Sequence, residues 1–330
     1  MNIIAVNPGH NGSVAFLVDG ELKFYIEEER LRRSKYDGNP FRGILEAVQY
    51  GVDFIVLGGT SDQFATLPWT GEDSYTALVR KFCPNVQTVN LGDQHHLGHV
   101  AECFYNSGFE DAVAIIVDGA GSYHTISAGE DENKIENSGW ETESIYDCSY
   151  PANFKPVFKK YGGNAQTTRS LVSNEIDMDN AVTITKAYEA VSHYLGFGFI
   201  EAGKTMGLAP YGKDDPDIPN IFINGRADKN LVTPSFPAGA FIEANRFPAL
   251  QHKFDPTEWH RDPTKVTDAA KNLAWRVQQE SQELVGDLIE KAVAITGKKN
   301  IVIAGGYGLN CVLTIICNNV FLILVFGAIQ

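Results

Sequence analysis

Three of the eight histidines in this sequence fall within five residues, in the stretch H-H-L-G-H from His95 to His99. His95 and His99 are four residues apart, so on a helix they share a face and can chelate one ion. Imidazole suits Zn²⁺ or Fe²⁺. The spacing is that of the helical histidine pair of zinc proteases, but His96 stands where those enzymes have a glutamate. The stretch predicts a metal site without the base of peptide hydrolysis; the alternative is two polar histidines on a surface helix.

A second candidate is the stretch V-D-G-A-G-S at residues 117–122, where an aspartate follows an apolar run. An aspartate at the end of a buried strand, followed by Gly119 and Gly121, exposes backbone N–H groups to a phosphate or places a carboxylate beside a metal. Asp118 is therefore a candidate third ligand for the histidine-bound ion. The alternative is an ordinary β-turn, because Asp-Gly is common in turns.

Two further glycine-rich stretches could form nucleotide-binding turns. Residues 201–212, E-A-G-K-T-M-G-L-A-P-Y-G, are not a Walker A loop, but Gly203 and Lys204 would let backbone and ammonium approach a nucleotide. A flexible loop is the alternative there. In A-G-G-Y-G-L-N-C, residues 304–311, two glycines at a strand end permit close approach of the backbone to a ligand, and Asn310 can hydrogen-bond it. These two glycines are Gly305 and Gly306.

The N-terminal hairpin and the charged stretch after it supply a histidine and a group of cations. His10 lies in N-P-G-H-N-G-S, residues 7–13. The stretch E-E-E-R-L-R-R-S-K, residues 27–35, is the one dense basic cluster in an acidic chain, and it suits an anionic group. A solvated charge run is the alternative. The cations are Arg30, Arg32, Arg33 and Lys35.

Short strands and two helices must position these residues. Asp19-Gly20 between apolar runs is a hairpin signal, and residues 112–117 are apolar throughout, as in a strand covered on both faces. Apolar residues recurring at spacings of four or seven predict a helix over 267–296. The predicted strands are 3–7, 13–18, 21–27, 54–57, 86–91, 112–117 and 301–304; antiparallel strands and loops fill 122–170, a helix covers 180–195, and 214–263 is an irregular insertion.

The order of these elements indicates the fold class. Periodicity alone supports an α/β fold with a mixed sheet. A hairpin-rich start, a strand ending in Asp-Gly, and a long helix leading into a strand that ends in Gly-Gly form the layout of the actin-like ATPase (ASKHA) fold. In that fold two β-sheet lobes flank a nucleotide cleft, and glycine turns after strands approach the phosphates.

Composition narrows the function classes. The chain has 330 residues, enough for about two domains, and its formal net charge is −14. Such an acidic chain is not expected to bind nucleic acid through its overall field. Five cysteines without a C-x-x-C pair argue against a disulfide framework and against a thiolate zinc site. The N-terminus lacks the pattern of a signal peptide, so a cytoplasmic location is predicted.

The C-terminal stretch departs from the rest of the chain. Residues 301–330 contain no Asp, Glu, Lys or Arg, and 320–329 are nearly all apolar. A membrane-spanning helix needs about 20 apolar residues, a length that is reached here only by including Asn310, Asn318 and Asn319. A truncated or frame-shifted end is therefore preferred over a membrane anchor.

Taken together, six of these stretches resemble the O-carbamoyltransferases of the NodU/CmcH/TobZ type. They are the stretches around His10, residues 27–36, 95–99, 117–122, 203–212 and 304–311, and they occur in the family's order. The resemblance implies that carbamoyl phosphate and ATP form carbamoyl-adenylate in a C-terminal YrdC-like domain. The adenylate then passes to the actin-like domain, where a hydroxyl of a small metabolite or sugar accepts the carbamoyl group.

The resemblance also implies roles for individual residues. His95, His99 and Asp118 would hold a divalent metal, Fe²⁺, Zn²⁺ or Mg²⁺, that acts as a Lewis acid. His10 and Lys35 would lie in the carbamoyl and acceptor pocket, with His10 as general base for the hydroxyl. A homodimer is possible, and neither nucleic acid nor membrane is expected as a partner. The nucleotide cleft would be lined by Gly203, Lys204, Gly305, Gly306 and Asn310, with Gly119 and Gly121 at the phosphate turn.

Three departures from the family pattern limit this reading. Asn11 stands where the family usually has an aspartate, and Ser122 stands where it usually has a glutamate. The third departure is the end: 1–311 is expected to be an actin-like domain with an incomplete second lobe, 312–330 an apolar tail, and the YrdC-like domain is expected to be absent. The alternatives are an inactive fragment or nucleotide-binding module, and an actin-like sugar kinase, which would need an acidic base near its acceptor.

Overall fold

The computed structural model describes residues 1–128, 135–164, 171–178, 183–198, 200–250, 262, 265–313 and 322–325. The chain divides into two compact units, Met1–Gly98 and His99–Ala328. The division falls inside one continuous helix, α4 (His95–Ser107), so His95 and His99 lie on the same helix. Each unit contains a β-sheet of its own.

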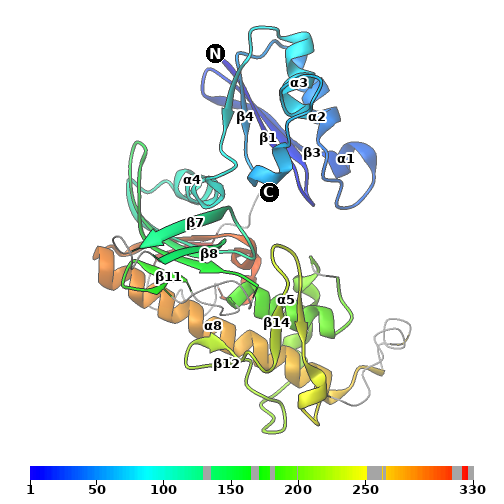
Figure 1. The fold of residues 1–330 in the computed structure, drawn as a ribbon, viewed down its shortest axis with the longest axis vertical. Helices are drawn as coiled ribbons and strands as arrows, with labels where there is room; N and C mark the ends of the chain where they lie inside the picture. Colours follow the sequence, from blue (N-terminus) through cyan, green and yellow to red (C-terminus); the bar gives the residue numbers. More distant parts are fainter. Residues whose placement is uncertain are drawn as a thin grey trace. The chain divides into compact units, whose positions relative to one another are not determined.

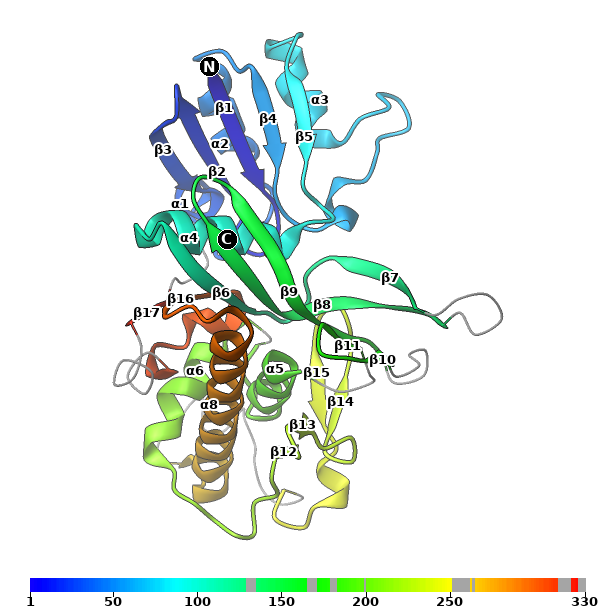
Figure 2. The same cartoon turned by 90° about the vertical axis from the view of Figure 1, so that its left-hand side faces the viewer.

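The first unit is built on a five-stranded mixed sheet in the order β3-β2-β1-β4-β5 (Figure 2). The first three strands are antiparallel neighbours, whereas β4 pairs with β1 and β5 with β4 in parallel. Its elements are β1 (Asn2–Asn7), β2 (Ser13–Val18), β3 (Glu21–Glu27), α1 (Glu28–Arg32), α2 (Phe41–Val48), β4 (Phe54–Leu57), η1 (Ser61–Phe64), α3 (Ser74–Phe82) and β5 (Gln87–Asn90).

Local sequence explains these elements. Asp19 and Gly20 both have positive φ, as a tight hairpin between β2 and β3 requires. Asp73 caps α3, because its carboxylate accepts hydrogen bonds from the backbone N–H groups of Tyr75 and Thr76. Alternate residues of the strands, such as Ile4 and Val6, are buried and form this unit's core with one face of α2.

The second unit is built on a larger mixed sheet in the order β10-β11-β9-β8-β6-β16-β17, with β7 beside β8. Strands β6 and β16 are parallel neighbours, and Ala304 lies opposite Ile116. The strands of this sheet are β6 (Asp111–Val117), β7 (Tyr123–Ala128), β8 (Ile135–Ser149), β9 (Asn153–Gly162), β10 (Leu171–Val172), β11 (Ile176–Met178), β16 (Asn300–Ala304) and β17 (Leu322–Val325).

Helices cover both faces of this sheet (Figures 1 and 2). Helix α8 (Asp268–Thr296) and helix α5 (Ile184–Tyr194) pack together on one face, and α4 lies on the other, where Phe104 meets Phe154 of β9. Thr267 caps the start of α8 and Gly297, with φ +70°, ends it. The remaining elements are α6 (Ala202–Leu208), η3 (Ala209–Tyr211), β12 (Phe222–Ile223), β13 (Arg226–Ala227), β14 (Val232–Pro234), β15 (Ala240–Ile242), η4 (Ala244–Arg246) and η6 (Gly306–Leu309).

Most of the predicted helices and strands are confirmed, and so is the predicted α/β class. Two sheet-bearing units, the second with a strand-Asp-Gly turn beside a helix-strand-Gly-Gly turn, have the arrangement of an actin-like fold. The flexible-loop alternative for residues 201–212 is wrong, because α6 and η3 occupy most of that stretch. The predicted insertion 214–263 contains short hairpins up to residue 250; residues 251–261, 263 and 264 lie outside the described residues.

The apolar tail at 312–330 is described only in part. Residues 322–325 form β17, which extends the second sheet in parallel with β16, while 314–321 and 326–330 lie outside the described residues. Among the residues that the structure describes, no helix is both long and apolar enough to cross a membrane.

Candidate functional site

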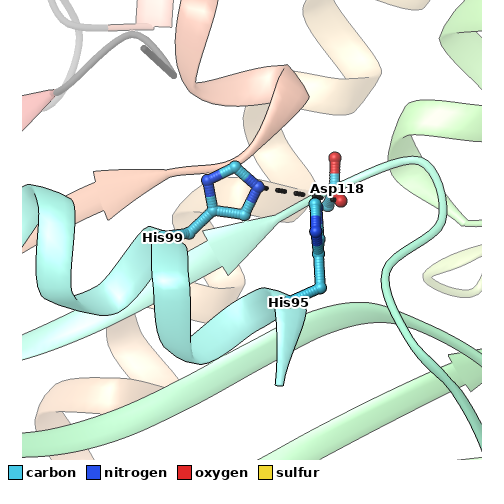
Figure 3. A group of neighbouring side chains, drawn as sticks. All are labelled: His95, His99 and Asp118. Carbon is cyan, nitrogen blue, oxygen red and sulfur yellow. Dashed lines mark ion pairs between the residues drawn. The ribbon is translucent and has the colours of Figure 1, made fainter. Parts of the chain in front are cut away.

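His95, His99 and Asp118 converge at the first turn of α4 and the end of β6 (Figure 3). Each offers one ligand atom, and these atoms lie within 4.8 Å of one another. The His99 Nε2 atom is 3.9 Å from Asp118 Oδ2. His99 and Asp118 are buried, whereas His95 is half-buried. The structure thus brings together the three residues predicted as metal ligands.

Backbone and side-chain contacts fix this arrangement. The Asp118 N–H donates to the Thr142 carbonyl at 2.7 Å, and Asp118 Oδ1 accepts from the Gly306 N–H at 3.1 Å. A carboxylate oxygen of Glu102 lies 3.8 Å from His99 Nδ1, on the side away from Asp118. This distance is longer than a hydrogen bond, but Glu102 lies on the side of the imidazole where carboxylates that orient ligating histidines are found. The cluster therefore has a partial outer layer that the sequence reasoning did not identify.

Two of the predicted glycine turns lie side by side, because they follow the parallel strands β6 and β16. Gly305 has φ +92°, and a Cβ there would lie 2.5 Å from the Val117 carbonyl oxygen. A Cβ on Gly306 would lie 3.2 Å from Asp118 Oδ1. The Gly121 N–H donates to the Glu141 carbonyl at 2.8 Å, so that amide is used within the fold. Close backbone approach explains why glycine occupies these positions.

A buried ion pair that the sequence reasoning missed lies beneath the Asp118 turn. Lys186 Nζ contacts Glu189 Oε2 at 2.8 Å and the Pro237 carbonyl at 2.7 Å. Glu189 Oε1 is 2.8 Å from where a Cβ on Gly119 would lie. Burial raises the pKa of Glu189, Lys186 opposes the rise, and the Asp118 carboxylate adds to it. The sequence could have indicated this ion pair, because Lys186 and Glu189 are three residues apart on a predicted helix.

A buried carboxylate, that of Glu141, belongs to a residue whose backbone bonds the same turn. The Glu141 backbone exchanges hydrogen bonds with Gly121 and Ser122, and its side chain pairs with Lys159. Burial by itself lowers the pKa of Lys159, but the Glu141 carboxylate and the Tyr146 hydroxyl outweigh it and leave that pKa raised. Two ion pairs, Lys186–Glu189 and Lys159–Glu141, therefore lie next to the turn that carries Asp118.

The remaining residues predicted for the second unit have separate surroundings. Gly203 and Lys204 are exposed on α6, where Lys204 Nζ pairs with Glu201 at 2.6 Å and lies 5.7 Å from the Phe197 ring centroid. The Asn310 side chain is buried and exchanges two hydrogen bonds with Gln278 of α8, at 3.0 and 3.2 Å. Both ends of that amide are thus engaged inside the fold.

His10 and Lys35 belong to the first unit and lie on two interlocked loops. The Gly9 N–H donates to the Gly38 carbonyl at 3.1 Å, and the Gly12 N–H donates to the Asp37 carbonyl at 2.9 Å. A Cβ on Gly38 would lie 2.4 Å from the Gly9 carbonyl oxygen, so a side chain there would separate the loops. The exposed imidazole of His10 uses Nδ1 to contact the Asn11 side-chain oxygen.

Comparison with known proteins assigns the family. The model of the carbamoyltransferase N-terminus matches residues 69–321, so the chain belongs to this family. The matched range includes the whole His95, His99 and Asp118 cluster.

Individual relatives are distant. Nodulation protein NolNO of Sinorhizobium fredii is 23% identical over 333 residues, which cover 92% of this chain and 41% of that protein. An uncharacterized protein of Synechocystis sp. is 23% identical over 353 residues, which cover 92% and 50%. The chain thus spans half or less of the length of these relatives. The crystal structure of T. kodakarensis HypF is 13% identical with a TM-score of 0.48, covering 99% of this chain and 45% of HypF.

Proposed function

We propose that this chain carries the carbamoyl-transfer site of an O-carbamoyltransferase. The observation that carries the proposal is the family match over residues 69–321, within which the three candidate metal ligands converge. The donor is carbamoyl-adenylate, made from carbamoyl phosphate and ATP. The acceptor is a hydroxyl group of a small metabolite or sugar.

The candidate metal site fits a divalent ion by its donor set. Two imidazoles and one carboxylate suit Fe²⁺ or Zn²⁺ better than Mg²⁺, which prefers oxygen ligands. His95, His99 and Asp118 would hold the ion, with Glu102 orienting His99. When bound, such an ion supplies Lewis-acid chemistry that polarises a reacting carbonyl or phosphoryl oxygen.

Side chains of the first unit have roles in the same proposal. His10 accepts the proton of the acceptor hydroxyl at Nε2, because Nδ1 is directed at the Asn11 side-chain oxygen. Lys35 lies in the carbamoyl and acceptor pocket, where its ammonium group binds an oxygen atom of the carbamoyl donor or of the acceptor. Nucleotide contacts are proposed for Gly119, Gly203, Lys204, Gly305 and Gly306. Gly121 and Asn310 are left out, because the Gly121 N–H and both ends of the Asn310 amide form hydrogen bonds within the fold.

The proposed function is tested by supplying the donor directly. Purified protein, freshly prepared carbamoyl-adenylate and glycerol as a minimal hydroxyl acceptor are expected to give O-carbamoyl glycerol faster than the protein-free reaction. Product is measured by mass spectrometry, and removal of metal with a chelator is expected to return the rate to that background. A rate at background in the metal-loaded protein would contradict carbamoyl transfer by this chain.

Nucleotide binding by residues 201–212 has its own test, Gly203→Ala. Nothing lies within 4 Å of a Cβ at Gly203, so alanine fits and should stabilise α6 by about 0.8–1 kcal/mol. The added methyl group, where the backbone of Gly203 is proposed to contact the nucleotide, is expected to reduce ATP affinity about tenfold. Calorimetry measures this affinity, and the melting temperature measures the change in stability. Gly286→Ala on α8, also with open space, is the matched control that stabilises without affecting ATP. Unchanged affinity in Gly203→Ala would remove this residue from the nucleotide site.

A further inference from the structure

The first unit contains a cavity of about 390 Å³, and Lys35 is the only one of its lining residues to which the proposed reaction gives a role. Its lining residues lie on α1 and in the loop that follows; they are Glu29, Arg30, Arg33 and Lys35. Three of these four side chains are cations, in a chain whose formal net charge is −14. A cavity with net positive lining in an acidic protein concentrates anions locally.

The cations of this region divide into two groups. Arg30 pairs with Glu27 at 3.2 Å and with Glu29 at 3.3 Å, and Arg32 pairs with Asp37 at 2.9 Å. Within the described part of the chain, Arg33 and Lys35 have no carboxylate within ion-pair distance. The paired arginines hold the loop, whereas Arg33 and Lys35 keep their charges available to a ligand.

The backbone around these two cations is held in an unfavourable conformation. Arg33 has φ +57° and Tyr36 has φ +60°, a left-handed conformation that costs a non-glycine residue about 1 kcal/mol or more. The loop is kept there by the Tyr36 N–H, which donates to Glu29 Oε2 at 3.1 Å, and by the hydrogen bonds that Asp37 and Gly38 accept from the His10 turn. At Arg33 this conformation is that of the residue that ends α1, and it directs the chain into the loop that carries Lys35.

We infer that Arg33 and Lys35 bind a phosphate-class oxyanion, and that this anion is a substituent of the hydroxyl acceptor. This inference rests on the proposed function. The phosphates of the nucleotide are assigned to glycine turns of the second unit, which leaves the cations of the first unit for the other reactant. A planar guanidinium and an ammonium are the side chains best suited to a phosphate. The acceptor class is therefore a phosphorylated alcohol or sugar.

Selectivity between two acceptors provides the test. Wild-type protein, supplied with carbamoyl-adenylate, is expected to use glycerol 3-phosphate with a kcat/KM at least about 100-fold above that for glycerol, as two charge-assisted contacts would give. Arg33→Ala is expected to reduce that ratio at least tenfold, mainly by raising KM. Lys81→Ala, which removes an exposed cation from α3 of the same unit, is expected to leave the ratio unchanged.

A binding measurement separates this inference from the proposed function. Inorganic phosphate should shift the NMR signals of residues 29–37 in wild-type and Lys81→Ala protein. In Arg33→Ala protein, the affinity for phosphate obtained from these shifts should be about tenfold lower. Transfer to neither acceptor, with these shifts intact, would contradict the proposed function and leave the anion site standing. Equal use of both acceptors, or an Arg33→Ala protein that loses affinity for carbamoyl-adenylate and keeps the acceptor ratio, would overturn the inference.

Discussion

A protein in which His95 and His99 are both replaced by alanine is expected to lose its divalent metal and its transfer activity. The change removes two of the three ligand atoms that converge within 4.8 Å, leaving only the Asp118 carboxylate. Changes to residues that merely support metal ligands already cost 10–100-fold in affinity or activity. Loss of two ligands should therefore lower transfer to glycerol by roughly a hundredfold or more, with metal content falling to the level of chelated protein.

The control for this double change is His193→Ala. His193 is an exposed histidine on α5, where its ring contacts Phe241, so the variant removes an imidazole that is not part of the cluster. Metal content measured by mass spectrometry and the transfer rate should both stay at the wild-type level in this control. If the double variant retains stoichiometric metal, the ion is held elsewhere and the assignment of His95 and His99 is wrong.

Gly305→Ala is expected to destabilise the second unit by about 3 kcal/mol or more. Alanine at φ +92° costs about 1–2 kcal/mol by itself. Its Cβ would also lie 2.5 Å from the Val117 carbonyl oxygen and 2.8 Å from the Val117 carbonyl carbon, so β6 and β16 would have to separate. The midpoint of urea unfolding, followed by circular dichroism, measures the effect.

Gly297→Ala separates the two contributions. Gly297 ends α8 with φ +70°, and a Cβ at this position would have nothing within 4 Å. Its replacement by alanine therefore has the free-energy cost of the left-handed backbone but no steric clash. We expect a loss of about 1 kcal/mol in this control. Equal losses in the two variants would mean that β6 and β16 can adjust at little cost, contrary to the close packing of these turns.

Much of the fold follows from local patterns in the sequence. Residues 112–117 are apolar throughout because β6 is covered on both faces, and Thr267 and Gly297 mark the ends of α8. The three candidate metal ligands could be predicted for the same reason. Two histidines four residues apart identify one face of a helix, and an aspartate directly after a strand identifies the edge of a sheet. Each of these signals lies within a few neighbouring residues.

Contacts between distant residues could not be predicted in this way. The side-chain amide of Asn310 is of a type that often binds ligands. In the structure, however, this amide forms hydrogen bonds with Gln278, 32 residues earlier on α8. The interlock of Gly12 with Asp37 requires two loops to meet, and neither loop alone shows it. Residues 203–207 contain two glycines and so suggest a loop, but packing of α6 against α5 and α8 overrides the low helix propensity of glycine.

The Asp118 carboxylate serves two turns at once. One oxygen accepts the Gly306 N–H and the other faces His99, so the glycine turn after β16 and the histidines of α4 share a single side chain. Anything that moves this carboxylate toward an ion alters its hold on Gly306, and a ligand that orders the glycine turn fixes the carboxylate in return. Thermodynamic linkage makes such an effect reciprocal. If the histidines bind a metal and the glycine turn binds a nucleotide, as proposed, each ligand should change the affinity for the other by the same factor.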